Sequence, residues 1–329
     1  MSYQPASDRY TTLSYNRCGE SGLKLPAISL GLWHNFGSDA NIDRMKTLLF
    51  TAFDRGITHF DIANNYGPYP GAAEENFGRI LKSDLHPYRD ELLISTKAGY
   101  TMWDGPYGDF GSRKYLLSSL DHSLRRMGLE FVDIFYHHRP DPDTPLEETM
   151  GALDQAVRSG KALYAGLSNY DGETMRRASA ILRELRTPFV INQNSASILN
   201  RRIDGNGLRQ AVIDEKKGLI IYCPLAQGLL AGRYTNGIPA DSRVRTSGRF
   251  LKESSITPEV LAKVEALGKL AMARGQTLAQ MSLSWLFTRE GVTSVLIGAS
   301  KPEQILENVQ LNTSFTADEL AEIDRIALS

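Results

Sequence analysis

The chain has 329 residues, of which 42% are hydrophobic and 23% are charged, and these proportions are ordinary for a globular protein. Its 37 basic and 38 acidic side chains nearly cancel, which argues against binding to nucleic acid or an anionic membrane through bulk charge. Two cysteines are too few for a disulfide scaffold, and no segment resembles a signal peptide or a membrane helix. We therefore expect a cytoplasmic protein, whose length allows either two average domains or one large barrel domain over residues 1–329.

Eight short runs rich in β-branched residues predict strands. In chain order they are AISLGLW (27–33), HFDIA (59–63), LLISTK (92–97), VDIFYHH (132–138), LYAGLSN (163–169), FVINQN (189–194), LIIYCPL (219–225) and SVLIG (294–298). Segments with apolar residues at three- and four-residue spacing lie between these runs and predict amphipathic helices.

Three of the predicted helices carry boundary residues. They begin near Arg44, at Ser112 and at Thr144. We expect Ser112 and Thr144 to be N-caps, with Pro145 in the first helical position. Glycines should stop these helices, namely Gly56, Gly128 and Gly160.

Strands that alternate with helices form a parallel sheet, and eight such units in about 250 to 330 residues predict a closed (β/α)₈ TIM barrel. The alternative is an open doubly wound sheet. That fold usually binds a dinucleotide through a GxGxxG turn after its first strand, where this chain has HNFGSDA. The sequence therefore favours the barrel.

One long segment, residues 227–257, follows the seventh predicted strand and is longer than most loops of a compact domain. Basic residues outnumber acidic ones in it. The basic residues are Arg233, Arg243, Arg245, Arg249 and Lys252, and the acidic ones are Asp241 and Glu253. We expect a lid loop that binds an anion.

Four reactive side chains stand at or just beyond predicted strand ends: Asp61, Tyr66, Lys97 and His138. Each alone has a structural interpretation, as a turn residue, a solvent-exposed lysine or a packing aromatic. Active sites of (β/α)₈ barrels lie at the carboxyl ends of the strands, however, so the four should meet at one rim.

Together these groups suit the protonation of a carbonyl oxygen. Tyrosine has an ordinary pKa of about 10, and a nearby Lys97 ammonium should favour the phenolate and lower that pKa. Asp61 would keep the lysine charged. Because the chain has neither a GxSxG nor an HExxH motif, the protonated carbonyl should receive a hydride from a cofactor.

Two adjacent histidines, His137 and His138, end the fourth run. Strand residues alternate in direction, so only one of them can face the barrel interior. Periodicity groups His138 with Ile134 and Tyr136 but does not say which set points inward.

Seven segments resemble, in order, the signatures of the aldo-keto reductases: FDIANNYG, STKAGY, VDIFYHHRP, GLSNY, INQ, YCPLAQGLLAGRY and IGASKPEQILENV. The resemblance spans nearly the whole chain. It implies a (β/α)₈ barrel that binds NADPH without a Rossmann fold. By this resemblance Tyr66 is the proton donor, Lys97 and Asp61 are the pair that tunes it, and His138 orients the substrate carbonyl.

The same resemblance implies a set of cofactor contacts along the strand ends. Those implied for the nicotinamide half are Trp33, Ser168, Asn169, Gln193 and Tyr222. Those implied for the phosphates are Pro224, Leu225, Gln227, Gly228, Arg233 and Arg243. Those implied for the adenosine half are Gly298, Ser300, Gln304, Glu307 and Asn308. Two positions depart from the family pattern, with Cys223 in place of a common serine and Lys301 in place of arginine or a neutral residue.

The implied substrate is a small aldehyde such as L-glyceraldehyde 3-phosphate or methylglyoxal. Trp33, Tyr66 and Trp103 would wall its pocket. Arg113 or Arg139 would meet a substrate phosphate, unless each simply pairs with a nearby acid.

Two other functions compete with aldehyde reduction. The first is a cofactor-binding sensor similar to the potassium channel β-subunits, which carry asparagine at the position of His138. The second is a metal-dependent hydrolase, which would need His-x-His at an early strand where this chain has His59, Phe60 and Asp61. Similarity to relatives also implies a homo-oligomer, a tetramer or an octamer.

Overall fold

The computed structural model describes residues 3–234, 237–238, 245 and 251–329. Eight parallel strands close into a barrel, because β10 pairs with both β3 and β9. The strands are β3 (Ile28–Gly31), β4 (His59–Asp61), β5 (Leu93–Ala98), β6 (Val132–His137), β7 (Ala162–Ser168), β8 (Phe189–Ser195), β9 (Gly218–Tyr222) and β10 (Val292–Ile297). All eight lie within the predicted runs or extend them by a few residues. The predicted barrel is confirmed, and the alternative of an open doubly wound sheet is wrong.

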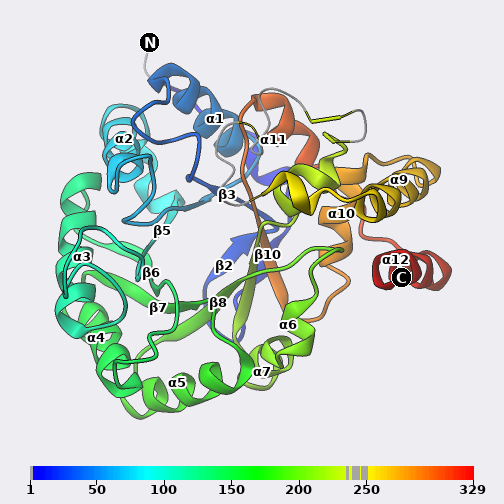
Figure 1. The fold of residues 1–329 in the computed structure, drawn as a ribbon. Helices are drawn as coiled ribbons and strands as arrows, with labels where there is room; N and C mark the ends of the chain where they lie inside the picture. The colour runs from blue at the N-terminus through cyan, green and yellow to red at the C-terminus, as the bar shows by residue number, and fades with distance from the viewer. Residues whose placement is uncertain (1–2, 235–236, 239–244, 246–250) are drawn as a thin grey trace.

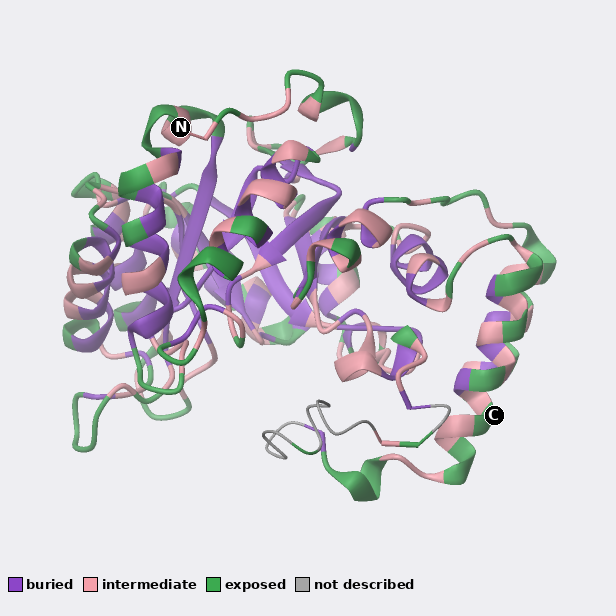
Figure 2. Cartoon of the chain, turned by 90° about the horizontal axis from the view of Figure 1, so that it is seen from above, coloured by how far each residue is buried: buried purple, intermediate pink, exposed green. Residues whose placement is uncertain are grey.

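Helices surround the barrel (Figure 1). They are α1 (Ile42–Asp54), α2 (Ala72–Ile80), α3 (Arg113–Met127), α4 (Leu146–Arg158), α5 (Gly172–Glu184), α6 (Arg202–Gly205), α7 (Leu208–Asp214), α9 (Pro258–Ala273), α10 (Leu278–Leu286), α11 (Pro302–Asn308) and α12 (Ala317–Leu328). Figure 2 shows the strands buried and the outer helix faces exposed. Within the described ranges, no helix is long and apolar enough to cross a membrane.

The helix boundaries follow the sequence signals with two exceptions. Ser112 caps α3 by accepting a hydrogen bond from the Tyr115 N–H at 3.2 Å, and Gly128 ends that helix at a φ of 67°. The prediction for α4 is wrong, because Pro145 occupies its N-cap position and Thr144 precedes it. The Asp141 carboxylate accepts the N–H of Thr144 at 3.2 Å, so a turn occupies this site. In α1, Asn41 is the N-cap and the helix begins two residues before Arg44.

A short antiparallel hairpin, β1 (Tyr15–Arg17) with β2 (Lys24–Pro26), was not predicted. Around it, Cys18 and Leu25 pack in one buried cluster with Ile134, Tyr136 and Ile220 from the barrel strands. Side chains from strands on opposite sides of a barrel meet only inside it, so the hairpin side chains help to fill the barrel interior. Strands of three residues are too short to show a period of two, which explains the omission.

A close contact between α2 and α3 depends on Gly78, where an added Cβ would lie 2.4 Å from the backbone oxygen of Arg126. We expect Gly78→Ala to lower the free energy of unfolding by about 1–3 kcal/mol, because overpacking forces backbone to shift. Gly268→Ala in α9 is the matched control, since nothing lies within 4 Å of its Cβ. It should raise stability slightly through helix propensity. Urea unfolding followed by circular dichroism measures both, and equal midpoints would contradict the contact.

Candidate active site

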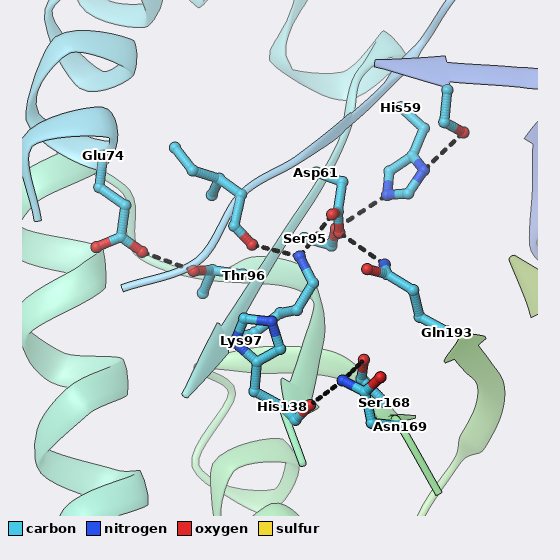
Figure 3. A network of polar contacts seen from close by, with 12 residues as sticks. His59, Asp61, Glu74, Ser95, Thr96, Lys97, His138, Ser168, Asn169 and Gln193 are labelled. Carbon is cyan, nitrogen blue, oxygen red and sulfur yellow. Dashed lines mark hydrogen bonds and ion pairs between the residues drawn. The ribbon is translucent and has the colours of Figure 1, made fainter. Parts of the chain in front are cut away.

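A buried ion pair joins β4 to β5 at the rim of the barrel. The Lys97 Nζ donates to Asp61 Oδ2 at 2.5 Å and to the Ile62 carbonyl oxygen at 2.7 Å (Figure 3). Both charged side chains have no exposed surface. Burial lowers the pKa of Lys97, and the Asp61 carboxylate opposes that shift. The pair that the sequence predicted does meet.

Tyr66 lies beside this pair on the loop after β4, with the Lys97 Nζ 5.2 Å from its ring centroid. Burial raises the pKa of Tyr66 well above 10, and the Asp61 charge raises it further. This direction is opposite to the lowering expected from the sequence. The reason is that desolvation of the phenol and the carboxylate both disfavour a phenolate. The phenol therefore remains protonated at neutral pH.

The two histidines at the end of β6, His137 in the strand and His138 just after it, point to opposite sides. His137 lies toward the helices, with its Nδ1 2.7 Å from the Tyr170 hydroxyl. His138 is the inward one, with its ring centroid 4.6 Å from that of Tyr100 and 6.0 Å from that of Tyr66. This orientation agrees with Tyr136, the neighbour of the same parity, which fills the barrel interior.

The His138 imidazole is neutral at ordinary pH. Burial lowers its pKa well below 6.5, and the charges of Lys97 and Arg139 act in the same direction. Its Nδ1 is buried without a hydrogen-bond partner in the described part of the chain. A neutral ring with an unused polar atom is suited to contact a polar ligand.

Polar side chains from the ends of β7, β8 and β9 form the other side of the same rim. The Tyr222 hydroxyl donates to Asn169 Oδ1 at 2.7 Å, and Asn169 Nδ2 donates to the His138 carbonyl oxygen at 2.9 Å. Asn169 holds a left-handed φ of 64°. Gln193 Nε2 donates to Asp61 at 3.2 Å, while Ser168 accepts from Asn169 at 3.2 Å. These side chains lie close to the ion pair and His138.

The segment after β9 has an unusual backbone. Cys223, Ala226, Gln227 and Gly228 all have positive φ, between 47° and 98°. Left-handed backbone in residues other than glycine is strained and is found most often at ligand sites. Of the other residues predicted in this segment, Pro224 is buried while Leu225 and Arg233 are partly exposed. Arg243 lies outside the described residues.

The residues predicted for the adenosine half lie between β10 and the end of α11. Gly298 is exposed just after the strand. Gln304 Oε1 accepts the Ser300 N–H at 2.7 Å and so caps the start of α11. Asn308 is buried at the end of this helix, and Glu307 is partly exposed. The exposed Lys301 stands at the N-cap of α11, beside this turn.

The residues predicted for the substrate are dispersed. Trp33 lies beside Tyr66, with ring centroids 6.0 Å apart, whereas Trp103 is 42% exposed and packs edge-on against Tyr115. Arg139 donates to Asp109 at 2.6 Å, which is the acid pairing considered as its alternative. Arg113 donates to the Gly151 carbonyl oxygen at 3.0 Å, so its guanidinium lies against α4 in the helix layer.

Three residues at or beneath the site were missed by the sequence reasoning: His59, Ser95 and Tyr100. His59 and Ser95 stand two positions before Asp61 and Lys97 on the same strands, so strand alternation could have placed them on the inner face. Tyr100 lies in a loop, where no period exists. Within the described ranges, no cluster of three or more His, Cys, Asp or Glu side chains could hold a metal ion.

Comparison with known proteins gives consistent matches. A model described as the aldo/keto reductase family matches residues 27–328. The chain is 55% identical over 325 residues to L-glyceraldehyde 3-phosphate reductase of Escherichia coli strain K12, covering 97% of this chain and 93% of that protein. It is 34% identical over 304 residues to a probable voltage-gated potassium channel subunit beta of Arabidopsis thaliana, covering 91% and 90%. A crystal structure of a thermostable aldo-keto reductase with the inhibitor epalrestat aligns with a TM-score of 0.74 at 26% identity, covering 95% of this chain and all of that one.

The buried ion pair yields a stability prediction. Lys97→Met leaves the Asp61 charge buried without its partner, so it should lower the free energy of unfolding by about 3–5 kcal/mol. Adding Asp61→Asn should recover much of that loss, because the unpaired charge disappears. Lys269→Met, which removes the exposed pair with Glu265, should leave the urea midpoint unchanged. The single variant Asp61→Asn completes the comparison. If the losses of unfolding free energy in the two single variants added up to the loss in the double variant, the two side chains would be uncoupled and the prediction would be wrong.

Proposed function

This chain belongs to the aldo/keto reductase family and is an oxidoreductase, and we propose that it reduces small aldehydes to alcohols with NADPH as cofactor. The observation that carries this proposal is the Asp61–Lys97 pair beneath a protonated Tyr66, across from the neutral His138. An acid, a cation and an uncharged polar ring then face one space at the barrel rim.

In this proposal each of the four side chains has a distinct role. Tyr66 donates its phenolic proton to the carbonyl oxygen as negative charge builds there, a contribution of about 10² to 10⁴ in rate. The Lys97 ammonium stabilises the phenolate that remains, and Asp61 keeps that ammonium charged. His138 orients the carbonyl without adding a charge. When bound, NADPH supplies the hydride.

The residues around the rim fit a nicotinamide dinucleotide. Asn169 and Gln193 carry amide groups that match a carboxamide, and Tyr222 offers an aromatic face at the end of β9. The left-handed backbone at Cys223, Ala226, Gln227 and Gly228 suits a close phosphate contact. Arg233 and Arg243 would supply positive charge, and Gly298, Ser300, Gln304, Glu307 and Asn308 would meet the adenosine half.

For the substrate we propose L-glyceraldehyde 3-phosphate, with methylglyoxal as a smaller alternative. Support comes from the name and 55% identity of the Escherichia coli relative. Trp33 and Tyr66 would form the pocket wall. Arg113 lies against α4, and a substrate phosphate at Arg139 would have to compete with the Asp109 carboxylate. We also propose that the protein is a cytoplasmic homo-oligomer, as expected from the sequence.

A cofactor-binding sensor is the second candidate, favoured by the 34% identity to a potassium channel subunit. The two functions differ in turnover. Tight NADPH binding without reduction of any small aldehyde would favour the sensor.

Removing the proton donor tests the proposed chemistry. We expect Tyr66→Phe to lower kcat for aldehyde reduction by at least about 10²-fold while NADPH still binds, because only the acid is lost. Tyr69→Phe is the matched control, since Tyr69 is exposed on the same loop and donates to Glu75. NADPH absorbance gives the rates and fluorescence titration gives the affinity. Full turnover by Tyr66→Phe would disprove the assignment of the donor.

The phosphate contact predicts the choice of cofactor. Arg233→Ala should weaken NADPH more than NADH, because only NADPH carries the 2′-phosphate that a guanidinium binds well. Arg158→Ala on the outer face of α4 serves as the control, where Arg158 pairs with Asp154. Fluorescence titration gives the dissociation constants of NADPH and NADH for the wild-type protein and both variants. Equal losses for both cofactors would remove Arg233 from the 2′-phosphate site.

A further inference from the structure

A chain of hydrogen bonds runs through the buried interior of the barrel and ends at Asp61. Ser294 Oγ lies 2.7 Å from Ser29 Oγ, and Ser29 Oγ lies 2.9 Å from His59 Nδ1. His59 Nε2 lies 2.9 Å from Ser95 Oγ, which donates to Asp61 Oδ1 at 2.6 Å. None of these five side chains is exposed. Figure 3 shows His59, Ser95 and Asp61 in line with Lys97.

The charge on Asp61 sets the direction of each bond from Asp61 as far as Ser29. An ionised carboxylate only accepts, so Ser95 must give its single hydrogen to Asp61. Ser95 can then only accept from His59, which fixes a hydrogen on Nε2. Burial lowers the pKa of His59 to about 4, so the ring carries one hydrogen and its Nδ1 is bare. Nδ1 therefore accepts from Ser29. The single hydrogen of Ser294 is shared between two acceptors, Ser29 Oγ and the Pro26 carbonyl oxygen, each 2.7 Å away.

The same chain has a complete reversed arrangement. If Asp61 gained a proton, it would donate to Ser95, Ser95 to His59 Nε2, and His59 Nδ1–H to Ser29. Ser29 would donate to Ser294, whose hydrogen then reaches the Pro26 carbonyl oxygen at 2.7 Å. One proton added at Asp61 thus reverses each bond from Asp61 as far as Ser29 and moves the imidazole hydrogen from Nε2 to Nδ1.

We infer that His59 and Ser95 are positioning residues that aim a row of hydrogen-bond donors at Asp61, and that the tautomer of His59 follows the charge of the Asp61–Lys97 pair. This inference deepens the proposed function and rests on the role given there to Asp61 and Lys97. His59 acts through Ser95 and Asp61, with no contact to substrate or cofactor required.

Other charged groups near the chain bear on the same pair. The charges of Asp61 on β4 and Lys97 on β5 act on His59 in opposite directions. Tyr66 and Tyr136 both interact with the Asp61 charge, and Glu74 in α2 interacts with Lys97. The two tyrosines stay neutral near pH 7, because burial raises each pKa well above 10. A pH effect near neutrality that follows the chain therefore does not come from the phenols.

Nitrogen NMR of the full-length, ligand-free protein tests the tautomer. Long-range proton–nitrogen spectra of histidine-labelled protein at pH 7 should show His59 with hydrogen on Nε2, its signals assigned by their loss in His59→Phe. In Asp61→Asn the amide oxygen faces Lys97 and the amide nitrogen donates to Ser95, so the hydrogen should move to Nδ1. The signals of the half-exposed His122 should not change. The same tautomer in both proteins would overturn the inference.

Kinetics of Ser95→Ala test the positioning role. Loss of one hydrogen bond to the charged carboxylate should lower kcat about 10-fold and move the acidic limb of the kcat–pH profile about one unit upward. The Michaelis constant for aldehyde and the affinity for NADPH should stay the same. Ser282→Ala is the matched control, since Ser282 is fully buried in α10 and its hydroxyl has no partner in the described structure. If the acidic limb of the kcat–pH profile did not move, Ser95 would have only a structural role and the inference would be wrong.

The two tests separate this inference from the proposed function. If the protein reduced no aldehyde, or if Tyr66→Phe kept full turnover, the proposed function would fail while the tautomer exchange in Asp61→Asn would still be seen. If Tyr66→Phe behaved as expected and the tautomer did not change, only the chain mechanism would fail.

Discussion

The buried ion pair between Asp61 and Lys97 is the constraint around which the active rim is organised. Two charges without exposed surface lose several kcal/mol of hydration each, and such a pair often gives no more stability than well-packed apolar side chains would. The barrel compensates with Ser95 and Gln193 on the carboxylate and the Ile62 carbonyl on the ammonium. The first and third of these partners lie on or beside β4 and β5, whereas Gln193 comes from β8, so full satisfaction of the carboxylate requires the folded barrel.

Strand register determines where the reactive groups stand. Asp61 pairs with Ser95, and Lys97 pairs with Tyr136, so residues of equal parity on three neighbouring strands face the interior together. His138 continues the parity of Tyr136, which explains why it meets Tyr66 while His137 meets Tyr170. A shift of one residue in β6 would exchange the two histidines.

Periodic features were predictable from the sequence, and non-periodic ones were not. The eight strands, the cap at Ser112 and the meeting of Asp61 with Lys97 follow from alternation and from the rule that barrel sites lie at strand ends. The hairpin of β1 and β2 was not predicted, because three residues are too few to show the alternation of apolar and polar side chains. The pKa of Tyr66 was predicted in the wrong direction, because burial is a property of packing and outweighs one ammonium. The position of Arg113 against α4 depends on where a long side chain turns, which spacing alone does not determine.

An aromatic side chain, Tyr136, packs beneath the ion pair inside the barrel. Tyr136 fills the barrel below Lys97, with its ring centroid 5.8 Å from the Nζ. It can do so because its neighbour on β7 is Gly166, where an added Cβ would lie 2.5 Å from the Tyr136 ring. The aromatic floor excludes water from the ammonium and contributes a favourable cation–π contact. Because water does not reach Lys97 from below, Asp61 is the group that balances the lysine charge. The hydrogen bonds that hold Asp61 ionised therefore also keep the Lys97 ammonium charged beside Tyr66.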